Sequence, residues 1–183
     1  THEAYSGVYC HNDMDMLVVD MHGKGDNAEV LGKVVGGCTD TEYKTHFALW
    51  AMKNSPLMIG CDVRKMTPET KEILTNADII SLNQDIECRG PYCIRQWNNP
   101  EKVFALVKPL CGGDYAIGMF NFSDKTSEMS LQFFDIGLPT SSGRALELYD
   151  CHAHETIGTF TERYAAQIPS HDCLVFRAKV VKK

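Results

Sequence analysis

A helical pattern followed at once by a short apolar run restricts the fold of this chain more than any other feature. The helix predicted over residues 39–53 begins with Thr39 and Glu42, which have the spacing of a capping box. Its large apolar residues recur at helical intervals on one face, and Pro56 ends it. The apolar run at 56–61 is then typical of a strand buried on both faces of a parallel sheet.

The rest of the first half repeats this alternation. A first strand candidate ends in HNDMDMLVV, residues 11–19, and a glycine-rich loop is predicted over 22–38. A second helix, with a threonine N-cap and a proline in its first turn, is predicted over 68–75, and a further short helix over 78–85. This order of elements predicts parallel strands. A complete (β/α)8 barrel takes about 250 residues, so residues 1–86 correspond to its last two β/α units.

The second half contains eight strand candidates and no good helical pattern. Turn signals rich in Asn, Gly, Pro and Ser separate them, which is typical of an antiparallel β-sandwich. We place the boundary near residues 85–90 and expect two domains, 1–86 and 87–183. The strand candidates are residues 92–97, 102–110, 114–122, 127–136, 144–150, 156–162, 164–169 and 171–180.

Charge and hydropathy disfavour some classes of partner. The 183 residues carry a net charge of −6, without a stripe of Lys and Arg, so a nucleic-acid or anionic-membrane partner is disfavoured. No apolar run approaches the ~18 residues of a membrane span. Residues 1–10 lack the basic start and long apolar middle of a signal peptide. A hydrophobic content of 44% is enough for a packed core.

The cysteines, eight in number, leave two interpretations open. Only Cys88 and Cys93 lie close together in sequence, around a Gly-Pro turn that a disulfide could close. The other interpretation has eight thiols in a reducing compartment, which predicts a cytoplasmic protein. Zinc sites prefer CxxC pairs, which the sequence lacks, and the spacing of His152, His154 and His171 fits no defined metal site.

The stretch HNDMDML, residues 11–17, places Asp13 and Asp15 two positions apart. In an extended chain these side chains share one face, and two carboxylates beside an apolar run are unfavourable unless something uses them. Paired aspartates after a strand are also common as turn formers and caps. Asp62 ends the second strand, where it could share a pocket with Asp15 or cap its own turn. His46 is expected at the surface or in packing.

Three segments, HNDMDML, CTDTEYKTHFALWAMKNSPLMIGCDVR and ILTNADIISLNQD, resemble the C-terminal part of glycoside hydrolase family 27, the α-galactosidases and α-N-acetylgalactosaminidases. The end of the chain, LYDCHAHETIGTFTERYAAQIPSHDCLVFR, is similar to the end of their C-terminal β-sandwich. The resemblance implies a (β/α)8 TIM barrel, of which this chain holds strands 7 and 8, followed by the sandwich. His11 stands where the family has tryptophan, and Met14 where proline is common.

The same resemblance implies substrate-binding residues at the carboxyl end of strand 7, where barrel enzymes have their active sites. Asp15 matches an aspartate that lines the galactose pocket, and Met16 matches its neighbour against the sugar. Asp13 is expected mainly to brace the strand end. An ionised carboxylate accepts strong, directional hydrogen bonds from sugar hydroxyls. The candidate substrate-binding residues are therefore Asp15, Met16 and Asp13.

No catalytic residue is assigned to this chain. Retaining glycosidases use two carboxyl groups about 5 Å apart, and in this family both lie upstream of the residues present. Asp13 and Asp15 are rejected as that pair, because two groups on one strand cannot easily flank the scissile bond from opposite sides. No metal or organic cofactor is expected, since the two carboxyl groups perform the chemistry.

The implied function is the C-terminal portion of a retaining α-galactosidase that hydrolyses terminal α-linked galactose, with the isolated chain inactive. The expected partners are an α-galactoside and the remaining barrel strands, on the same polypeptide or on a companion chain, and homo-oligomerisation stays open. The alternative is a non-catalytic remnant, or a carbohydrate-binding or assembly module built on the sandwich, with Trp97 and Tyr92 as stacking side chains.

Overall fold

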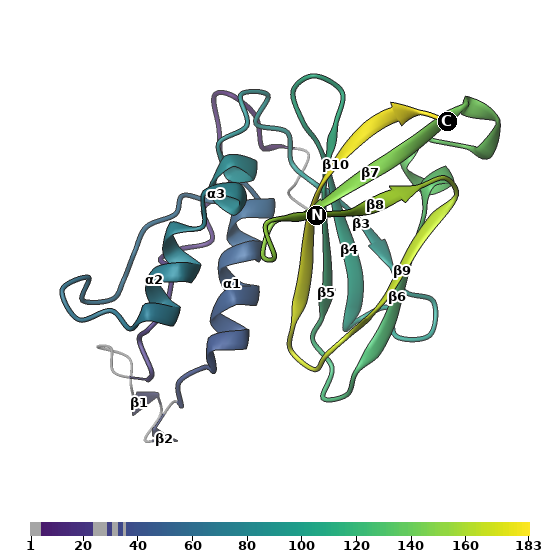
Figure 1. Ribbon diagram of the computed structural model, residues 1–183. Coiled ribbons are helices and arrows are strands. Elements are labelled where there is room, and N and C mark those ends of the chain that lie inside the picture. Colours follow the sequence, from purple (N-terminus) through teal and green to yellow (C-terminus); the bar gives the residue numbers. More distant parts are fainter. Residues whose placement is uncertain (1–4, 24–28, 31–32, 35) are drawn as a thin grey trace.

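A helical unit packs against a β-sandwich in the computed structural model of the protein, which describes residues 5–23, 29–30, 33–34 and 36–183 (Figure 1). The helical unit consists of α1 (Asp40–Met52), α2 (Pro68–Thr75) and α3 (Ala77–Asn83), and α1 contacts strands of the sandwich. None of the helices in the described part of the chain is long and apolar enough to cross a membrane.

Helix α1 begins where the capping box predicts. The Thr39 hydroxyl accepts a hydrogen bond from the N–H of Glu42, and the Glu42 carboxylate accepts one from the N–H of Thr39 at 2.8 Å. Helix α2 begins in the same manner, because the Thr67 hydroxyl accepts from the backbone three residues on. The helices predicted over 39–53 and 68–75 are confirmed.

Helix α3 is somewhat shorter than the helix predicted over 78–85. The Asn76 side chain accepts from the N–H of Ile79, so the helix begins directly after α2 ends. The chain leaves helical geometry at Gln84, whose N–H still bonds to the carbonyl of Ile80.

The prediction of two regular strands, one ending in residues 11–19 and one over 56–61, is wrong. They are reduced to one parallel bridge between Leu17 and Ile59. The N–H and carbonyl of Leu17 bond to the residues on either side of Ile59, at 2.8 and 3.2 Å. The parallel direction is therefore as predicted, but within the described residues each segment pairs only with the other. Parallel strands depend on several neighbours covered on both faces, which explains why no ladder extends from this bridge.

Gly60 permits the close approach of the two bridged segments. A Cβ atom at this position would lie 2.7 Å from the carbonyl oxygen of Leu17. Because that oxygen is a backbone atom inside the bridge, it cannot move aside without breaking the pairing.

The segment predicted as a loop over 22–38 contains a short antiparallel pair, β1 (Glu29–Val30) with β2 (Lys33–Val34). The predicted loop also includes residues 24–28, 31–32 and 35, which lie outside the described part of the chain.

The second half forms two antiparallel sheets, as predicted from its eight strand candidates. The larger sheet has the order β3-β4-β5-β10-β7-β8, and β6 pairs with β9 in the smaller one. The helical turns in this half are short 3-10 segments, and one of them, Phe133–Ile136, replaces the end of the strand predicted over 127–136. The strands are β3 (Tyr92–Arg95), β4 (Val103–Pro109), β5 (Tyr115–Asn121), β6 (Ser127–Gln132), β7 (Arg144–Asp150), β8 (Glu155–Phe160), β9 (Arg163–Ile168) and β10 (Cys173–Lys182).

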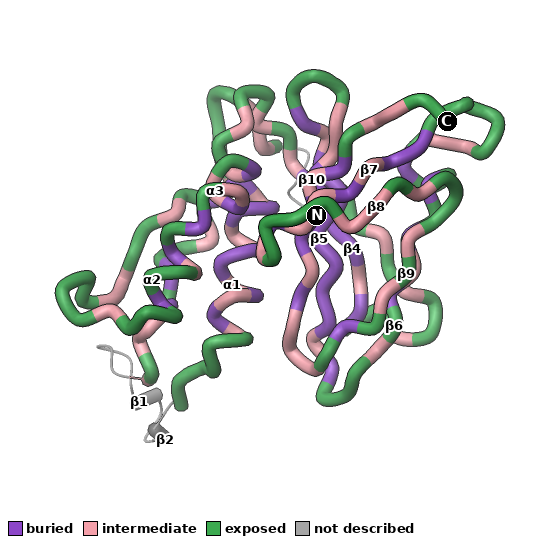
Figure 2. Tube along the Cα trace, in the orientation of Figure 1, coloured by how far each residue is buried: buried purple, intermediate pink, exposed green. Residues whose placement is uncertain are grey.

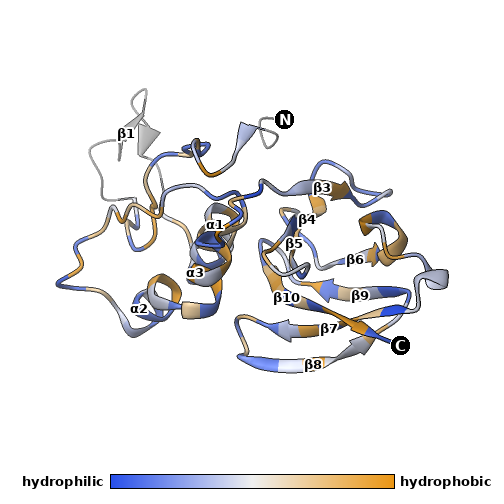
Figure 3. Cartoon of the chain, turned by 90° about the horizontal axis from the view of Figure 1, so that it is seen from above, coloured by the Kyte–Doolittle hydropathy of each residue, from blue (hydrophilic) through white to orange (hydrophobic). Residues whose placement is uncertain are grey.

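The larger sheet is covered on both faces at its centre (Figure 3). One face packs on the β6–β9 pair through a core that includes Leu131, Ile117 and Phe176. The other face packs on α1 through a second core that includes Phe47 and Phe120. Burial on both faces explains why β4 and β5 are almost continuously buried (Figure 2).

Gly118 on β5 keeps the contact between the sheet and α1 close. A Cβ atom there would lie 2.7 Å from the Phe120 ring and 3.2 Å from the side chain of Met52 at the end of α1. The absence of a side chain at this position therefore lets the last turn of α1 rest directly on the sheet.

Candidate functional site

The segment containing Asp13 and Asp15 is a turn and not the end of a regular strand. Asp15 has a φ of 71°, which an extended strand does not allow. The Asp13 carboxylate accepts from the N–H of Asp15 at 2.8 Å, and the Asp15 carboxylate accepts from the N–H of Met16 at 2.7 Å. The expectation that the two aspartates share one face of an extended chain is therefore wrong, because their carboxylates form the hydrogen bonds of the turn.

The predicted position of Asp13, Asp15 and Met16 at the carboxyl end of a regular strand is also not observed. Leu17, the bridged residue of this segment, follows the aspartates in the chain, so the turn leads into the paired residue. The local cause is Asp15, whose left-handed backbone interrupts any extended conformation before Leu17.

The turn is anchored to the C-terminal end of α1. The indole Nε1–H of Trp50 donates to the carbonyl of Asp15 at 2.8 Å. The N–H of Met14 donates to the hydroxyl of buried Ser55 at 2.9 Å. The two bonds hold the backbone just before and just after the exposed side chain of Asp15, so the end of α1 determines where its carboxylate lies.

Apolar side chains are exposed beside the parallel bridge. Leu17 and Val19 are buried against the helices, whereas the intervening Val18 and the preceding Met16 are 44% and 43% exposed. In the second segment Met58 and Ile59 are exposed as well. We call Met16, Val18, Met58 and Ile59 the bridge face. Exposed large apolar side chains on two paired segments are typical of a surface that another part of a protein covers.

Asp62 caps its own turn. Its carboxylate pairs with the guanidinium of Arg64 at 2.8 and 2.9 Å and accepts from the backbone N–H of the same residue. The hydrogen bonds from the Arg64 side chain and backbone lower the pKa of Asp62. Of the two roles expected for Asp62, facing a pocket or capping its own turn, the structure shows the cap.

His46 is a packing histidine. Its ring lies against Trp50 with centroids 3.8 Å apart, and its Nε2 accepts from the N–H of Val18 at 3.1 Å. Burial lowers the pKa of His46 from 6.5 to about 4. The sequence offered a signal for this role, because His46 and Trp50 lie four residues apart on one face of the predicted helix.

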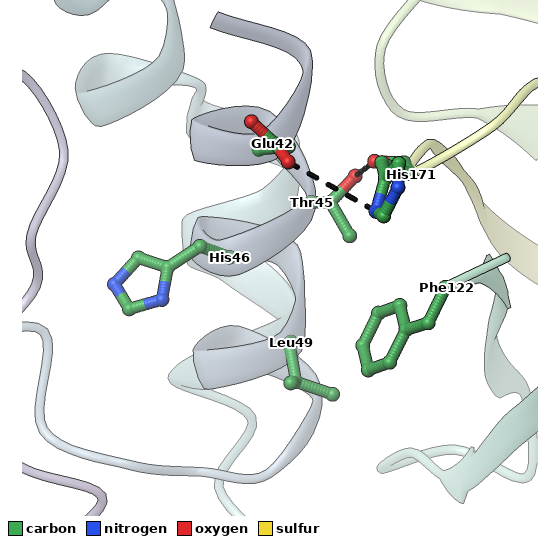
Figure 4. A pocket seen from close by; sticks show the side chains of 6 residues that line it. All are labelled: Glu42, Thr45, His46, Leu49, Phe122 and His171. Atoms are coloured by element: carbon green, nitrogen blue, oxygen red, sulfur yellow. Dashed lines mark hydrogen bonds and ion pairs between the residues drawn. The ribbon is translucent and has the colours of Figure 1, made fainter. Parts of the chain in front are cut away.

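Among the hollows that described residues line between α1 and the sandwich, the two beside Leu49 and Phe122 are not lined by Asp13, Asp15 or Met16. The smaller, of about 180 Å³, lies between Leu49 of α1 and Phe122 of the sandwich (Figure 4). The larger, of about 900 Å³, continues past the same two side chains to Met14 and Tyr92. Of the turn at residues 13–16, Met14 alone lines one of these two hollows.

Two of the three histidines considered for a metal site have separate carboxylate partners, and the buried Nδ1 of the third, His152, has no hydrogen-bond partner within the part of the chain that the structure describes. His154 pairs with Asp78 at 2.7 Å, and His171 pairs with Asp124 at 3.1 Å. Among the described residues no group of three or more His, Cys, Asp or Glu side chains could hold a metal ion. None of the eight cysteines, all of which the structure describes, forms a disulfide, so Cys88 and Cys93 are not bonded to each other.

Both parts of the chain match known proteins in the same order. The family described as Alpha galactosidase A matches residues 4–85, and the Alpha galactosidase C-terminal beta sandwich domain matches residues 102–178. The chain is 32% identical to the α-galactosidase of Coffea arabica over 146 residues, covering 77% of this chain and 36% of the relative. It is also 32% identical to that of Cyamopsis tetragonoloba over 173 residues, covering 94% of this chain and 37% of the relative.

The crystal structure of α-galactosidase I from Mortierella vinacea superposes with a TM-score of 0.77 at 27% identity, covering 92% of this chain and 39% of that one. Together the fold and the matches define the C-terminal portion of a barrel-plus-sandwich glycoside hydrolase. The chain belongs to the α-galactosidase family, glycoside hydrolase family 27. The predicted fold class, the last two β/α units of a (β/α)8 barrel followed by an antiparallel β-sandwich, is confirmed.

Proposed function

We propose that this chain is the C-terminal portion of a retaining α-galactosidase that hydrolyses terminal α-linked galactose. The observation that carries the proposal is the match of two successive α-galactosidase segments to residues 4–85 and 102–178. The chain spans only 36% and 37% of the two plant relatives. The exposed bridge face is where the remaining barrel strands would pack, on the same polypeptide or on a companion chain.

The division into a barrel part, residues 1–86, and a sandwich part, residues 87–183, is part of this proposal. Each part has its own hydrophobic residues, but the core around α1 joins them. The sandwich in this arrangement supports the barrel helices from outside.

Asp15, Met16 and Asp13 are the proposed substrate-binding residues. The Asp15 carboxylate accepts one hydrogen bond from Met16 within the turn, and a carboxylate has about four lone-pair sites, so sugar hydroxyls can donate to the others. Met16 is 43% exposed beside it, in a position to contact the sugar ring. Asp13 braces the turn through its bond to the N–H of Asp15.

The remaining features of the proposal follow from the sequence. A cytoplasmic location fits the eight free thiols, and the net charge of −6 fits the absence of nucleic-acid and membrane partners. A homo-oligomer remains compatible with the fold. A carbohydrate-binding or assembly module is the second candidate, favoured by Trp97, which is 95% exposed on the turn after β3.

The test compares the purified chain with a chimaera in which the upstream barrel part of the Cyamopsis tetragonoloba relative precedes it. We expect the isolated chain to leave 4-nitrophenyl α-galactoside unhydrolysed, because both catalytic carboxyl groups lie in the missing part. The chimaera should hydrolyse it. Turnover by the isolated chain would show that the catalytic groups are wrongly assigned to the upstream part. A folded but inactive chimaera would support the binding module.

A further inference from the structure

Lys108 is a wholly buried cation in the middle of the contact between the two parts of the chain. It lies on β4, a strand that is otherwise apolar, and none of its side chain is exposed. A buried ammonium group is costly unless hydrogen bonds and opposing partial charges compensate it. Lys108 donates to the side-chain Oδ1 of Asn54 and to the backbone carbonyl of Leu82.

Both acceptors of Lys108 lie at the C-terminal ends of helices. Asn54 follows the C-cap of α1 and has a φ of 56°, and Leu82 lies in the last turn of α3. The carbonyl ends of helices carry partial negative charge, which stabilises a cation placed against them. One ammonium group of the sandwich therefore holds the ends of two barrel helices together.

The residue after Asn54 continues this connection to the candidate site. The N–H of Ser55 donates to the carbonyl of Trp50 at 3.1 Å, and its hydroxyl accepts from the N–H of Met14. The Ser55 carbonyl accepts from the Asn83 side chain at 2.9 Å, which ties the same point to α3. Trp50 then donates its indole N–H to the carbonyl of Asp15.

We propose that Lys108 is a positioning residue: it fixes the end of α1 through Asn54, and thereby fixes the turn at residues 13–16 that carries Asp15. Its meaning for catalysis rests on the proposed function. The structural step does not, because the turn, α1, α3 and β4 are all present in this chain. The sandwich then supports the sugar-binding turn directly, across the contact between the two parts.

The two tryptophans allow the effect of Lys108 on the turn to be measured in this chain. The indole N–H of Trp50 is the group bonded to the turn, whereas Trp97 is exposed and serves as an internal reference. In Lys108→Met, the indole resonance of Trp50 should shift and its hydrogen exchange should accelerate about tenfold or more, as expected when a buried network loses one partner. The Trp97 resonance should stay unchanged.

Lys44→Met is the matched control. Lys44 pairs with Asp172 at 2.6 Å, so its loss also removes one cation from the contact between α1 and the sandwich. It lies near the other end of α1 and has no part in the bonds of Asn54 and Ser55. We expect Lys44→Met to leave the Trp50 resonance in place. An equal effect of both variants would overturn the proposal.

Asn54→Gly provides a second route if Lys108→Met does not fold. Glycine accepts the left-handed backbone of this position, so the change retains the turn. It removes one of the two acceptors of Lys108, together with the bond from Asn54 Nδ2 to the Arg89 carbonyl. It should reproduce the Trp50 shift of Lys108→Met. An unchanged Trp50 resonance would overturn the proposal.

A pH titration of the unmodified chain tests the role of the charge. Burial lowers the pKa of Lys108 from 10.5 to about 8, with Asp85 and Cys88 opposing this effect and Arg177 adding to it. The Trp50 resonance should therefore titrate with a midpoint near 8 while that of Trp97 stays flat, and a flat Trp50 resonance would contradict the proposal. In the chimaera, Lys108→Met should lower kcat and Lys44→Met should not; an inactive chimaera would affect only the proposed function.

Discussion

The ring nitrogen Nε2 of His46 accepts a hydrogen bond from the backbone N–H of Val18 at 3.1 Å. An imidazole can accept at this nitrogen only while it is unprotonated. The bond satisfies a backbone group next to the bridged Leu17, so α1 supports the first segment from its side as well as from its end. The neutral state of His46 is thus part of the structure.

Acid should destabilise the chain through this histidine. Burial lowers the pKa values of His46 and His152 from 6.5 to about 4. Above pH 6.5 these rings are neutral in both the folded and the unfolded chain, so their contribution to stability is complete. As the pH falls from 6.5 to 4, the unfolded chain binds protons that the folded chain excludes, and stability is lost. The urea midpoint measured from pH 7 to 4 should fall.

His46→Gln separates this effect from general acid denaturation. The amide oxygen of glutamine can accept from Val18 without titrating. The urea midpoint of this variant should fall less steeply over the same range. Parallel curves for the two proteins would show that the protonation of His46 does not contribute.

His154 should have the opposite pH dependence. The hydrogen bond to Asp78, with a smaller contribution from Glu72, raises the pKa of His154 above 6.5. The stabilisation is therefore complete below 6.5 and is lost as the pH rises through the raised value. An NMR titration of the ring should give a pKa above 6.5, and Asp78→Asn should lower it more than Glu72→Gln does. A titration at or below 6.5 in the unmodified chain would contradict the assigned contact.

Gly60→Ala should break the parallel bridge. The added methyl group would lie 2.7 Å from the Leu17 carbonyl oxygen, and overpacking of this kind costs about 1–3 kcal/mol. Hydrogen exchange at the Leu17 and Gly60 amides should accelerate, and the urea midpoint should fall. Gly36→Ala is the control, since a Cβ there meets no atom within 4 Å. Equal stabilities of the two variants would argue against a close bridge.

Asp15→Asn should impair turnover of the chimaera while leaving its fold intact. Asparagine tolerates the left-handed backbone of this position, but it removes the charge and turns one acceptor into a donor. Losing one charge-assisted bond to the sugar costs roughly 1.5–3 kcal/mol, or about ten- to a hundred-fold in kcat/KM.

Asp13→Asn is the comparison for Asp15→Asn. It should cost less in kcat/KM and more in melting temperature, because Asp13 bonds to the turn backbone. Equal kinetic losses would mean that both aspartates meet the substrate, and an unaffected Asp15→Asn enzyme would remove Asp15 from the site.

Most of the eight cysteines should react as free thiols when the unreduced protein is denatured and titrated with a thiol reagent. A protein that matures in a reducing compartment keeps such thiols unpaired. Six or more oxidised cysteines would exclude the proposed cytoplasmic location.

Local patterns predicted the elements that local interactions create. Thr39 and Glu42 satisfy each other within one helical turn, so the start of α1 could be read from four residues. The strands at 11–19 and 56–61 were predicted from apolar runs, and they are reduced to a bridge because the partners that such runs require are absent from the described residues.

The supports of the candidate site could not be predicted, because their partners are distant in sequence. Lys108 interrupts an apolar run, which is a visible signal, but its acceptors lie 54 and 26 positions away. No local pattern identifies them. The hydroxyl of Ser55 likewise reaches Met14 across 41 positions, and Ser55 by itself is an ordinary helix-terminating residue.

The separation between Lys108 and Asn54 also has a consequence for synthesis on the ribosome. Lys108 is added 54 residues after Asn54, which at about 5–20 residues per second takes roughly 3–11 s. During this interval the end of α1 exists without the ammonium group that holds it. The turn bearing Asp15 is thus translated before Lys108 but gains its last support only after it, so the order in which the site matures differs from the order in which it is made.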